Sequence, residues 1–252
     1  MIDSLFLFIG LALVAEILGT VGGFGSSLFF VPIAGFFLDF QSVLGITALF
    51  HVSSNISKIA LFKKNFDKKL IVSLGIPAIL FVIVGAYLSK YSDEKLLEFL
   101  LATFLILLSG ILLIFNTLKI KPTTVNSIAG GSLSGITAGL LGTGGAIRGL
   151  TLTAFSLPKE TFIVTSAIID FGVDFSRSVV YFSNGFIHKD DLYLIPILFI
   201  VSFAGTFLGK KILNLFSQEQ FRFITLGLIL IVGLTLLSKQ VWPTAFDFIN
   251  KN

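Results

Sequence analysis

Residues 18–27 read Leu-Gly-Thr-Val-Gly-Gly-Phe-Gly-Ser-Ser, and they interrupt an apolar run that extends from about residue 2 to residue 38. A helix needs only about 20 apolar residues to cross the roughly 30 Å hydrocarbon core of a bilayer, so this run is too long for one plain span. Glycine also disfavours a continuous helix, because it has the most backbone freedom to lose. We therefore predict a helix, a glycine-rich break at Gly22–Gly25, and a second helical arm.

A second break of the same kind lies in an apolar run over 125–156, where residues 139–145 read Gly-Leu-Leu-Gly-Thr-Gly-Gly. The remaining apolar stretches cover residues 42–62, 70–89, 96–116, 161–183, 192–209 and 219–238. Their lengths are typical of membrane-spanning helices. The fold class that we predict is an all-α polytopic membrane protein.

Composition supports this class and excludes several others. Of 252 residues, 55% are hydrophobic and 13% are charged, whereas a soluble domain carries about 25% charged residues. This excludes a soluble globular enzyme, a disordered chain and a nucleic-acid-binding protein. The net charge of +4 comes from Lys and Arg in the loops between the apolar runs. Basic residues at such positions keep loops of a membrane protein on the cytoplasmic side, so the charge does not indicate nucleic-acid binding. The chain has no cysteine and only two histidines, at 51 and 188, so we predict neither a metal site nor a cofactor.

Three short motifs of the first part of the chain recur in the same order, 119 to 123 residues later. The matching pairs are Leu18–Thr20 with Leu141–Thr143, Asn55–Lys58 with Asp174–Arg177, and Gly85–Lys90 with Gly205–Lys210. Such self-similarity indicates a duplicated unit. We therefore predict two homologous halves, residues 1–118 and 125–252, joined by a linker over 119–124 within one integrated transmembrane domain. Each half contains a glycine-broken helical hairpin and three transmembrane helices.

The halves fit two orientations. If each broken unit crosses the membrane once, the halves are parallel and the chain has eight spans. If each unit is a hairpin that returns to its own side, the second half is inverted. Transporters often combine inverted repeats with discontinuous helices that meet at a midplane site. We therefore expect inverted halves, with both breaks near the centre of the molecule and approached from opposite faces.

Several ionisable side chains lie in or beside apolar runs, where a charge at the bilayer centre costs about 2.5–3.5 kcal/mol. They are Glu16, His51, Lys58, Arg148, Asp170, Asp174 and Arg177. In the second half, helical spacing places on one face the residues Asp170, Asp174, Arg177 and Tyr181. The equivalent stripe of the first half is Thr47, His51, Asn55 and Lys58, with Ser166 matching Thr47. Both stripes are expected to face a protein interior or an aqueous cavity.

These features predict an anion site between the two breaks. The arms that start near Ser26 and Ala146 would point their partly positive amino ends at the breaks. The predicted substrate-binding residues are Gly25, Ser26, Ser27, Asn55, Lys58, Thr143, Gly144, Gly145, Arg148 and Arg177. The candidates for proton coupling are Glu16, His51, Asp170 and Asp174, because imidazole titrates near neutral pH and a buried carboxyl group can take up a proton.

Simpler interpretations of the same residues stay open. Asp174 would serve only as the partner of Arg177 on its own helix, and Lys58 would extend toward the membrane surface. Likewise, close helix packing is the better explanation for the ridge formed by Gly131, Gly135 and Gly139.

Two other functions meet the minimum demands of the pattern. Ser26 or Ser27 with His51 would suit an intramembrane hydrolase, although one dyad does not need a duplicated polar stripe. A channel would use the same pore-lining groups as a carrier.

As a set, the motifs resemble those of the TauE/SafE family of membrane permeases, whose members include exporters of sulfite and organosulfonates. The resemblance covers the whole length and rests on the two breaks, the first followed by Pro32, and on Asn55–Lys58. The second break, with Arg148, is not a strict copy of the first. Membership implies a secondary transporter of small sulfur-containing or carboxylate anions in the cell membrane, and not an enzyme. Its partners would be a small anionic substrate and the lipid bilayer.

Overall fold

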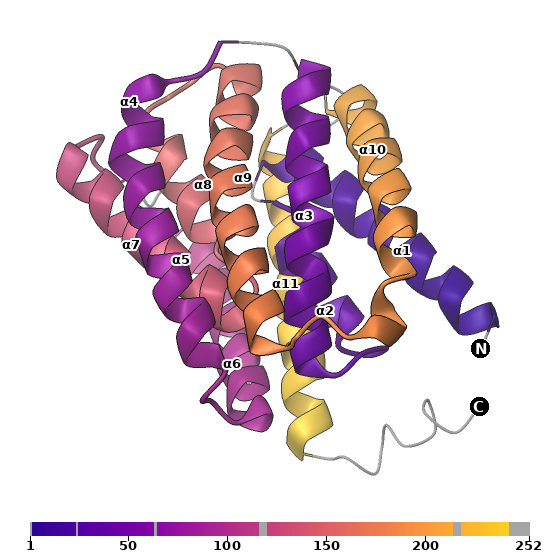
Figure 1. Ribbon diagram of the computed structural model, residues 1–252. Helices are drawn as coiled ribbons and strands as arrows, with labels where there is room; N and C mark the ends of the chain where they lie inside the picture. The colour runs from indigo at the N-terminus through magenta and orange to yellow at the C-terminus, as the bar shows by residue number, and fades with distance from the viewer. Residues whose placement is uncertain (1, 24, 63–64, 116–119, 214–217, 242–252) are drawn as a thin grey trace.

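The computed structural model describes residues 2–23, 25–62, 65–115, 120–213 and 218–241, and these residues fold into helices joined by short loops (Figure 1). The first part of the chain forms α1 (Ile2–Gly22), α2 (Ser27–Ala34), α3 (Phe40–Phe62), α4 (Lys68–Leu70), a π-helical turn η1 (Ile71–Gly75), α5 (Ile76–Ser89) and α6 (Glu94–Ile114). The second part forms α7 (Thr124–Leu141), α8 (Gly145–Thr153), α9 (Lys159–Asn184), a 3₁₀ turn η2 (Lys189–Asp191), α10 (Leu194–Ile212) and α11 (Gln218–Val241).

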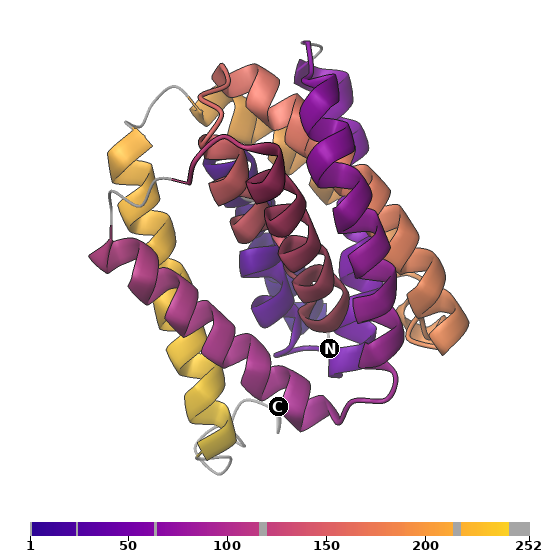
Figure 2. The same ribbon diagram turned by 90° about the vertical axis from the view of Figure 1, so that its left-hand side faces the viewer.

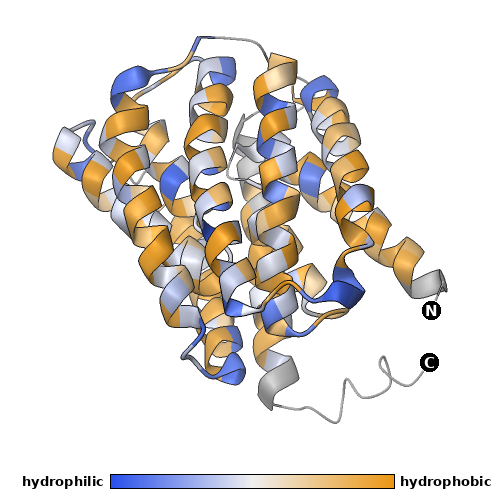
Figure 3. Ribbon diagram, in the orientation of Figure 1, coloured by the Kyte–Doolittle hydropathy of each residue, from blue (hydrophilic) through white to orange (hydrophobic). Residues whose placement is uncertain are grey.

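The prediction of an all-α polytopic membrane protein is confirmed. Among the described residues, five segments are long and apolar enough to cross a membrane: Leu5–Gly22, Phe40–Phe62, Lys68–Ser89, Glu94–Ile114 and Leu194–Ile212. Figure 3 shows apolar residues along most of the helices and strongly hydrophilic ones mainly near helix ends. Each long apolar run of the sequence became a helix or a broken pair of helices.

Both glycine-rich breaks interrupt the helix as expected. Helix α7 ends because Gly142 adopts a left-handed backbone with φ +74°, and its N–H bonds to the carbonyl of Ala138. At the end of α1, Gly23 has φ +68° and donates its N–H to the carbonyl of Gly19. Glycine tolerates this conformation without the strain that a side chain would add. Phe24 of the first break lies outside the described residues.

Four helices form the middle of the molecule. In Figure 1, α5, α9, α3 and α10 stand side by side in that order, and each is in contact with the next. Figure 1 also shows that α3 runs upward whereas α9 runs downward, and that α5 and α10 are likewise opposed. The central pair, α3 and α9, carries the two polar stripes, so the packing places them within reach of each other.

The outer helices pack in a matching way on the two sides. Helix α7 lies against α5, and α1 lies against α10. Figure 2 shows α6 and α11 crossing on one side of the molecule, and they are in contact. Residues 116–119, which include the end of the predicted first half and the start of the linker, lie outside the described residues.

The α5–α7 contact confirms the packing interpretation of the glycine ridge. A Cβ atom added at Gly131, Gly135 or Gly139 would collide with the backbone carbonyls of Leu74, Ala78 or Val82. Small residues let two helix backbones approach in this way, and this is how membrane helices often associate without a hydrophobic driving force.

Candidate functional site

The two breaks meet inside the molecule. Thr143, in the second break, donates its hydroxyl to Ser27 Oγ, at the first turn of α2, across 3.2 Å. A cavity of about 330 Å³, measured out to its open mouth, lies where both breaks face α3 and α9. Helices α2 and α8 begin at its wall, because Ser27 and Gly145 both line it.

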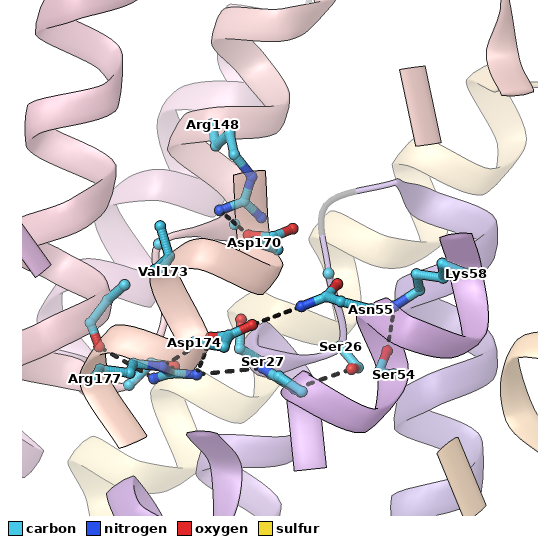
Figure 4. Close-up of a pocket in the computed structure, with 16 residues that line it drawn as sticks. Ser26, Ser27, Ser54, Asn55, Lys58, Arg148, Asp170, Val173, Asp174 and Arg177 are labelled. Carbon is cyan, nitrogen blue, oxygen red and sulfur yellow. Dashed lines mark hydrogen bonds and ion pairs between the residues drawn. The ribbon is translucent and has the colours of Figure 1, made fainter. Parts of the chain in front are cut away.

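The cavity brings together most of the side chains that the sequence singled out (Figure 4). Its lining includes every predicted substrate-binding residue except Thr143, and every predicted proton-coupling residue except Glu16. Thr143 and Glu16 lie one contact away, bonded to the lining residues Ser27 and Ser26. Of the predicted stripes, Thr47, Ser166 and Tyr181 do not line this cavity. Tyr181 donates to the carbonyls of Ala138 and Gly139, and the buried Oγ1 of Thr47 has no hydrogen-bond partner among the residues that the structure describes.

Glu16 on α1 holds the cation of α3. Its carboxylate is 3.0 Å from Lys58 Nζ and is fully buried. Four hydroxyl groups also donate to it, from Thr20, Ser26, Ser54 and Thr206. Lys58 further donates to Ser54 Oγ at 2.5 Å, so it does not extend toward the membrane surface. A buried charge needs such a complete set of partners to be tolerated.

Arg177 on α9 is bound by protein on every side. Its Nε and Nη2 each lie 2.8 Å from Asp174 Oδ1, and its Nη1 donates to the carbonyls of Ala138 and Gly142. The guanidinium thus covers carbonyl groups at the end of α7, where the helix dipole favours a cation. Asn55 of α3 donates to the other oxygen of Asp174 at 2.8 Å. This is the intrahelical pair that the simpler interpretation expected, extended to α7 and α3.

Arg148 on α8 pairs with Asp170 on α9, and here the surroundings are sparser. Its Nη1 contacts Asp170 Oδ1, and its Nε donates to Ser166 Oγ at 3.3 Å. Ser166 in turn donates to Asp170 Oδ2 across a long 3.4 Å. Figure 4 shows this pair standing apart from the network that joins Arg177, Asp174 and Asn55.

His51 links the two halves of the site through a chain of hydrogen bonds. Its Nδ1 lies 3.4 Å from Arg177 Nη2, and its Nε2 lies 3.0 Å from Ser26 Oγ. A guanidinium can only donate, so Nδ1 accepts and the imidazole proton sits on Nε2. His51 then donates to Ser26, which donates to Glu16 Oε2 at 2.6 Å. The neutral imidazole therefore connects the Arg177 network to the Glu16 network by hydrogen bonds.

The same chain argues against hydrolysis. Ser26 has the right distance to His51, but a nucleophilic serine needs its base to be oriented by an acceptor at the far ring nitrogen. Here a cation occupies that position, and the serine proton already points at a carboxylate.

A second cavity of about 250 Å³, again measured out to its open mouth, adjoins the site. Lys58, Asp170 and Gly25 line both cavities, so these residues stand between them. The second cavity reaches Thr20 at the end of α1 and Ser166 on α9.

Sequence reasoning missed two residues that complete the network around Glu16, Ser54 and Thr206. Ser54 has a usable signal, because it lies one turn before Lys58 on the same helical face. Thr20, one turn after Glu16, was expected as a hydroxyl donor at the break, and in the structure it donates to Glu16. Thr206 comes from α10, and nothing in its local sequence distinguishes it from other hydroxyls in apolar helices.

The comparisons with known proteins give a family. The model of the sulfite exporter TauE/SafE family matches residues 8–236. No curated protein and no solved structure matches the chain. Because the family match spans most of the sequence, this chain belongs to the TauE/SafE sulfite exporter family, and it is a membrane transporter of sulfur-containing anions and not an enzyme.

Proposed function

We propose that this protein is a secondary transporter that binds a small sulfonate-, sulfite- or carboxylate-type anion in the cavity between the two breaks, and that it couples anion transport to protons. The observation that carries the proposal is the set of groups at the cavity. Two helix amino ends and the cations Lys58, Arg148 and Arg177 line it, and each cation has a carboxylate partner.

The helix ends supply the part of an anion site that needs no charged side chain. Helices α2 and α8 are eight and nine residues long, and both begin at the cavity wall. A helix amino end carries about half a positive charge and unpaired N–H donors, both of which favour oxyanions. The hydroxyl of Ser27, which accepts from Thr143 and keeps its own proton, adds a donor beside them.

The charge balance supports proton coupling. With all carboxylates ionised, the three cations of the site are matched by Glu16, Asp170 and Asp174. An arriving anion would then leave an uncompensated negative charge in a low-dielectric interior, which is costly. Protonation of one carboxylate removes this cost, so anion and proton bind together.

Inverted halves are part of the proposal, with residues 1–118 and 125–252 as the two units and 119–124 as the linker. Three facts support them. The proposed equivalents α3 and α9 run in opposite directions, as do α5 and α10 (Figure 1). The contact of α1 with α10 is matched by that of α7 with α5. Left-handed Gly23 and Gly142 are separated by 119 residues, as are Asn55 and Asp174, which bond to each other.

This arrangement suits alternating access. In inverted-repeat transporters, one unit rocks against the other around a fixed midplane site. Asn55 of the first unit and Asp174 of the second join across the boundary between the units, as do Ser27 and Thr143. These contacts would have to persist or exchange as the cavity opens to one side or the other.

The test is uptake into proteoliposomes of radiolabelled sulfite, thiosulfate, sulfoacetate and acetate. We expect saturable uptake, counterflow from preloaded vesicles, acceleration by an acidic exterior, and loss of that acceleration with a protonophore. Ser27→Ala should lower uptake, whereas Ser183→Ala, which removes an exposed hydroxyl of α9, should not. Uptake without saturation or counterflow would indicate a channel, and no uptake of any of these anions would contradict the proposal.

A further inference from the structure

The three ion pairs of the cavity differ in how completely their members are bound, and this difference identifies the exchangeable one. Glu16 accepts from four hydroxyls besides Lys58. Arg177 directs all three of its nitrogens at protein acceptors. Removing a partner from either network would leave several buried polar groups unsatisfied. Neither cation is free to turn toward a substrate.

Arg148 and Asp170 have fewer ties. Among the described residues, the polar contacts of Arg148 are Ser166, through Nε, and Asp170, through Nη1. Its Nη2 instead faces the first break, 3.8 Å from where a Cβ at Gly25 would lie. A guanidinium carries five donors in a planar fork. Arg148 thus retains donating capacity directed at the cavity.

Asp170 is the most accessible carboxylate of the site. Its side chain is 12% exposed, compared with 7% for Asp174 and 0% for Glu16. It also lines both cavities, so water and small ions can reach it from either one. A carboxylate is itself a small monovalent oxyanion, and it binds guanidinium with the same geometry as a sulfonate or another carboxylate.

We propose that Asp170 occupies the place of the transported anion in the empty carrier. The inference rests on the transport function proposed above and names its exchange site. An incoming oxyanion takes over the guanidinium of Arg148, and the displaced Asp170 carboxylate takes up one proton from the aqueous side. On release, the anion leaves, the proton leaves Asp170, and the Arg148–Asp170 pair forms again.

The charges around Asp170 are compatible with this exchange. Arg148 of α8 and Lys58 of α3 are the nearest cations from other helices, with Arg177 on its own helix. Lys58 is held by Glu16, and Arg177 is held by Asp174, so both stay compensated when Asp170 is protonated. His51 of α3 stays neutral because it accepts from Arg177. Toward η1 and α5, the neighbours of Asp170 along α9 meet apolar groups, since Gly172 faces Ile79 and Ile169 faces Gly75.

The exchange fixes how charge moves. A bound monovalent anion replaces the charge of Asp170, so the empty and the loaded cavity carry the same net charge. Transport of a monovalent anion with one proton is then electroneutral. A divalent anion carries one net negative charge across. Keeping the cavity neutral in both states also avoids the cost of an uncompensated charge in the membrane.

The decisive measurement is sulfite binding to purified protein as a function of pH, with Asp170→Asn compared with Asp174→Asn as matched control. The two changes are identical and lie one helical turn apart. In the wild type, affinity should fall as pH rises, by up to about tenfold per pH unit once Asp170 ionises. Asp170→Asn should lose the part of this dependence that Asp170 contributes, keep only the part that comes from sulfite itself, and bind sulfite more tightly than the wild type at high pH. Asp174→Asn should keep the wild-type slope.

The protonation of sulfite itself is common to all variants and cancels in the comparison. A wild-type slope in Asp170→Asn, a lost slope in Asp174→Asn, or no sulfite binding by folded Asp170→Asn would each overturn the inference. If Asp170→Asn does not fold, the double variant Arg148→Gln/Asp170→Asn keeps a hydrogen-bonded neutral pair. We expect it to fold and to bind no sulfite, and wild-type affinity there would also overturn the inference.

Charge movement gives a readout that separates this inference from the general proposal. Uptake of methanesulfonate, a monovalent anion, should be indifferent to a potassium diffusion potential, and thiosulfate uptake should respond to it. If the wild type transports these anions and both respond equally, the exchange at Asp170 is wrong and the transporter remains. If the wild type transports none of the anions tested, the proposed function itself fails.

Discussion

The carboxylates on the two sides of the cavity have opposite surroundings. Glu16, from the first half, is fully buried and accepts from four hydroxyls and Lys58. Asp170, from the second half, is the most exposed carboxylate of the site, with Arg148 and one distant serine as partners. The contrast suggests a division of labour, in which a saturated network holds the helices and a sparsely bound pair is available for exchange. Similar charges in a membrane therefore need not have similar roles.

The largest expected effect comes from breaking the saturated network. Glu16→Ala should destabilise the protein by about 3–5 kcal/mol, because it leaves Lys58 buried without its counter-ion. The free energy of unfolding in detergent micelles is the measurement. Adding Lys58→Met to the same variant should restore part of the loss, since replacing both members of a buried pair is often nearly neutral. A Glu16→Ala protein as stable as the wild type would contradict the claim that the Glu16 network holds the helices together.

Arg177 tests the same contrast within α9. Arg177→Ala should lower stability by about 3–5 kcal/mol, because Asp174 loses its cation and the Gly142 carbonyl loses its donor, whereas the Ala138 carbonyl keeps Tyr181 and the Gly142 N–H. Arg177→Lys should recover only part of this, since an ammonium cannot reproduce the planar fork.

The double variant Asp174→Asn/Arg177→Ala separates stability from binding. If it folds and binds sulfite at wild-type affinity, Arg177 acts by holding the second break and not by touching the anion. If it folds and loses binding, the cation at Arg177 contributes directly, and the exchange would not be confined to Arg148.

Backbone packing offers a middle-sized effect that distinguishes the two sides of the molecule. Gly135→Ala should cost about 1–3 kcal/mol, because the new methyl group meets the Ala78 carbonyl of α5, which cannot easily move. On the other side, Gly205→Ala would meet Glu16 Cβ and Cγ at 2.7 Å and would disturb the saturated network. Gly110→Ala, with open space at its Cβ, is the control. Equal thermal stability of Gly135→Ala and Gly110→Ala would contradict the close approach of α5 and α7.

The smallest effect concerns the contact between the breaks. Thr143→Ala removes the hydrogen bond to Ser27 and should cost about 0.5–1.5 kcal/mol of stability, whereas Thr143→Ser keeps the hydroxyl and should cost less. We expect Thr143→Ala to slow proteoliposome transport clearly although its effect on stability is small, since the bond joins the two proposed units. Thr143→Ala and Thr143→Ser proteins with the same transport rate would show that this bond has no part in the cycle.

The sequence determined the class of this protein and the positions of its breaks. Apolar length predicts helices that cross a membrane, and glycine's backbone freedom ends α7 at Gly142 and allows the turn at Gly23. The three-residue and four-residue spacing on α9 placed Asp170, Asp174 and Arg177 on one face, and they do line one cavity. These are local properties, so the local sequence is enough to fix them.

Only the tertiary structure decided which charge pairs with which. Lys58 finds Glu16 because α1 and α3 both pack against α10, and Arg148 finds Asp170 because the second break folds α8 back beside α9. Nothing in the sequence around Thr206 or Ala138 indicates that they complete the shells of Glu16 and Arg177. How firmly a buried charged side chain is held depends on its whole set of partners, and most of those partners come from helices distant in the chain. That is why the sequence was enough to predict which residues form the site, but not which of its cations is bound least completely by the protein.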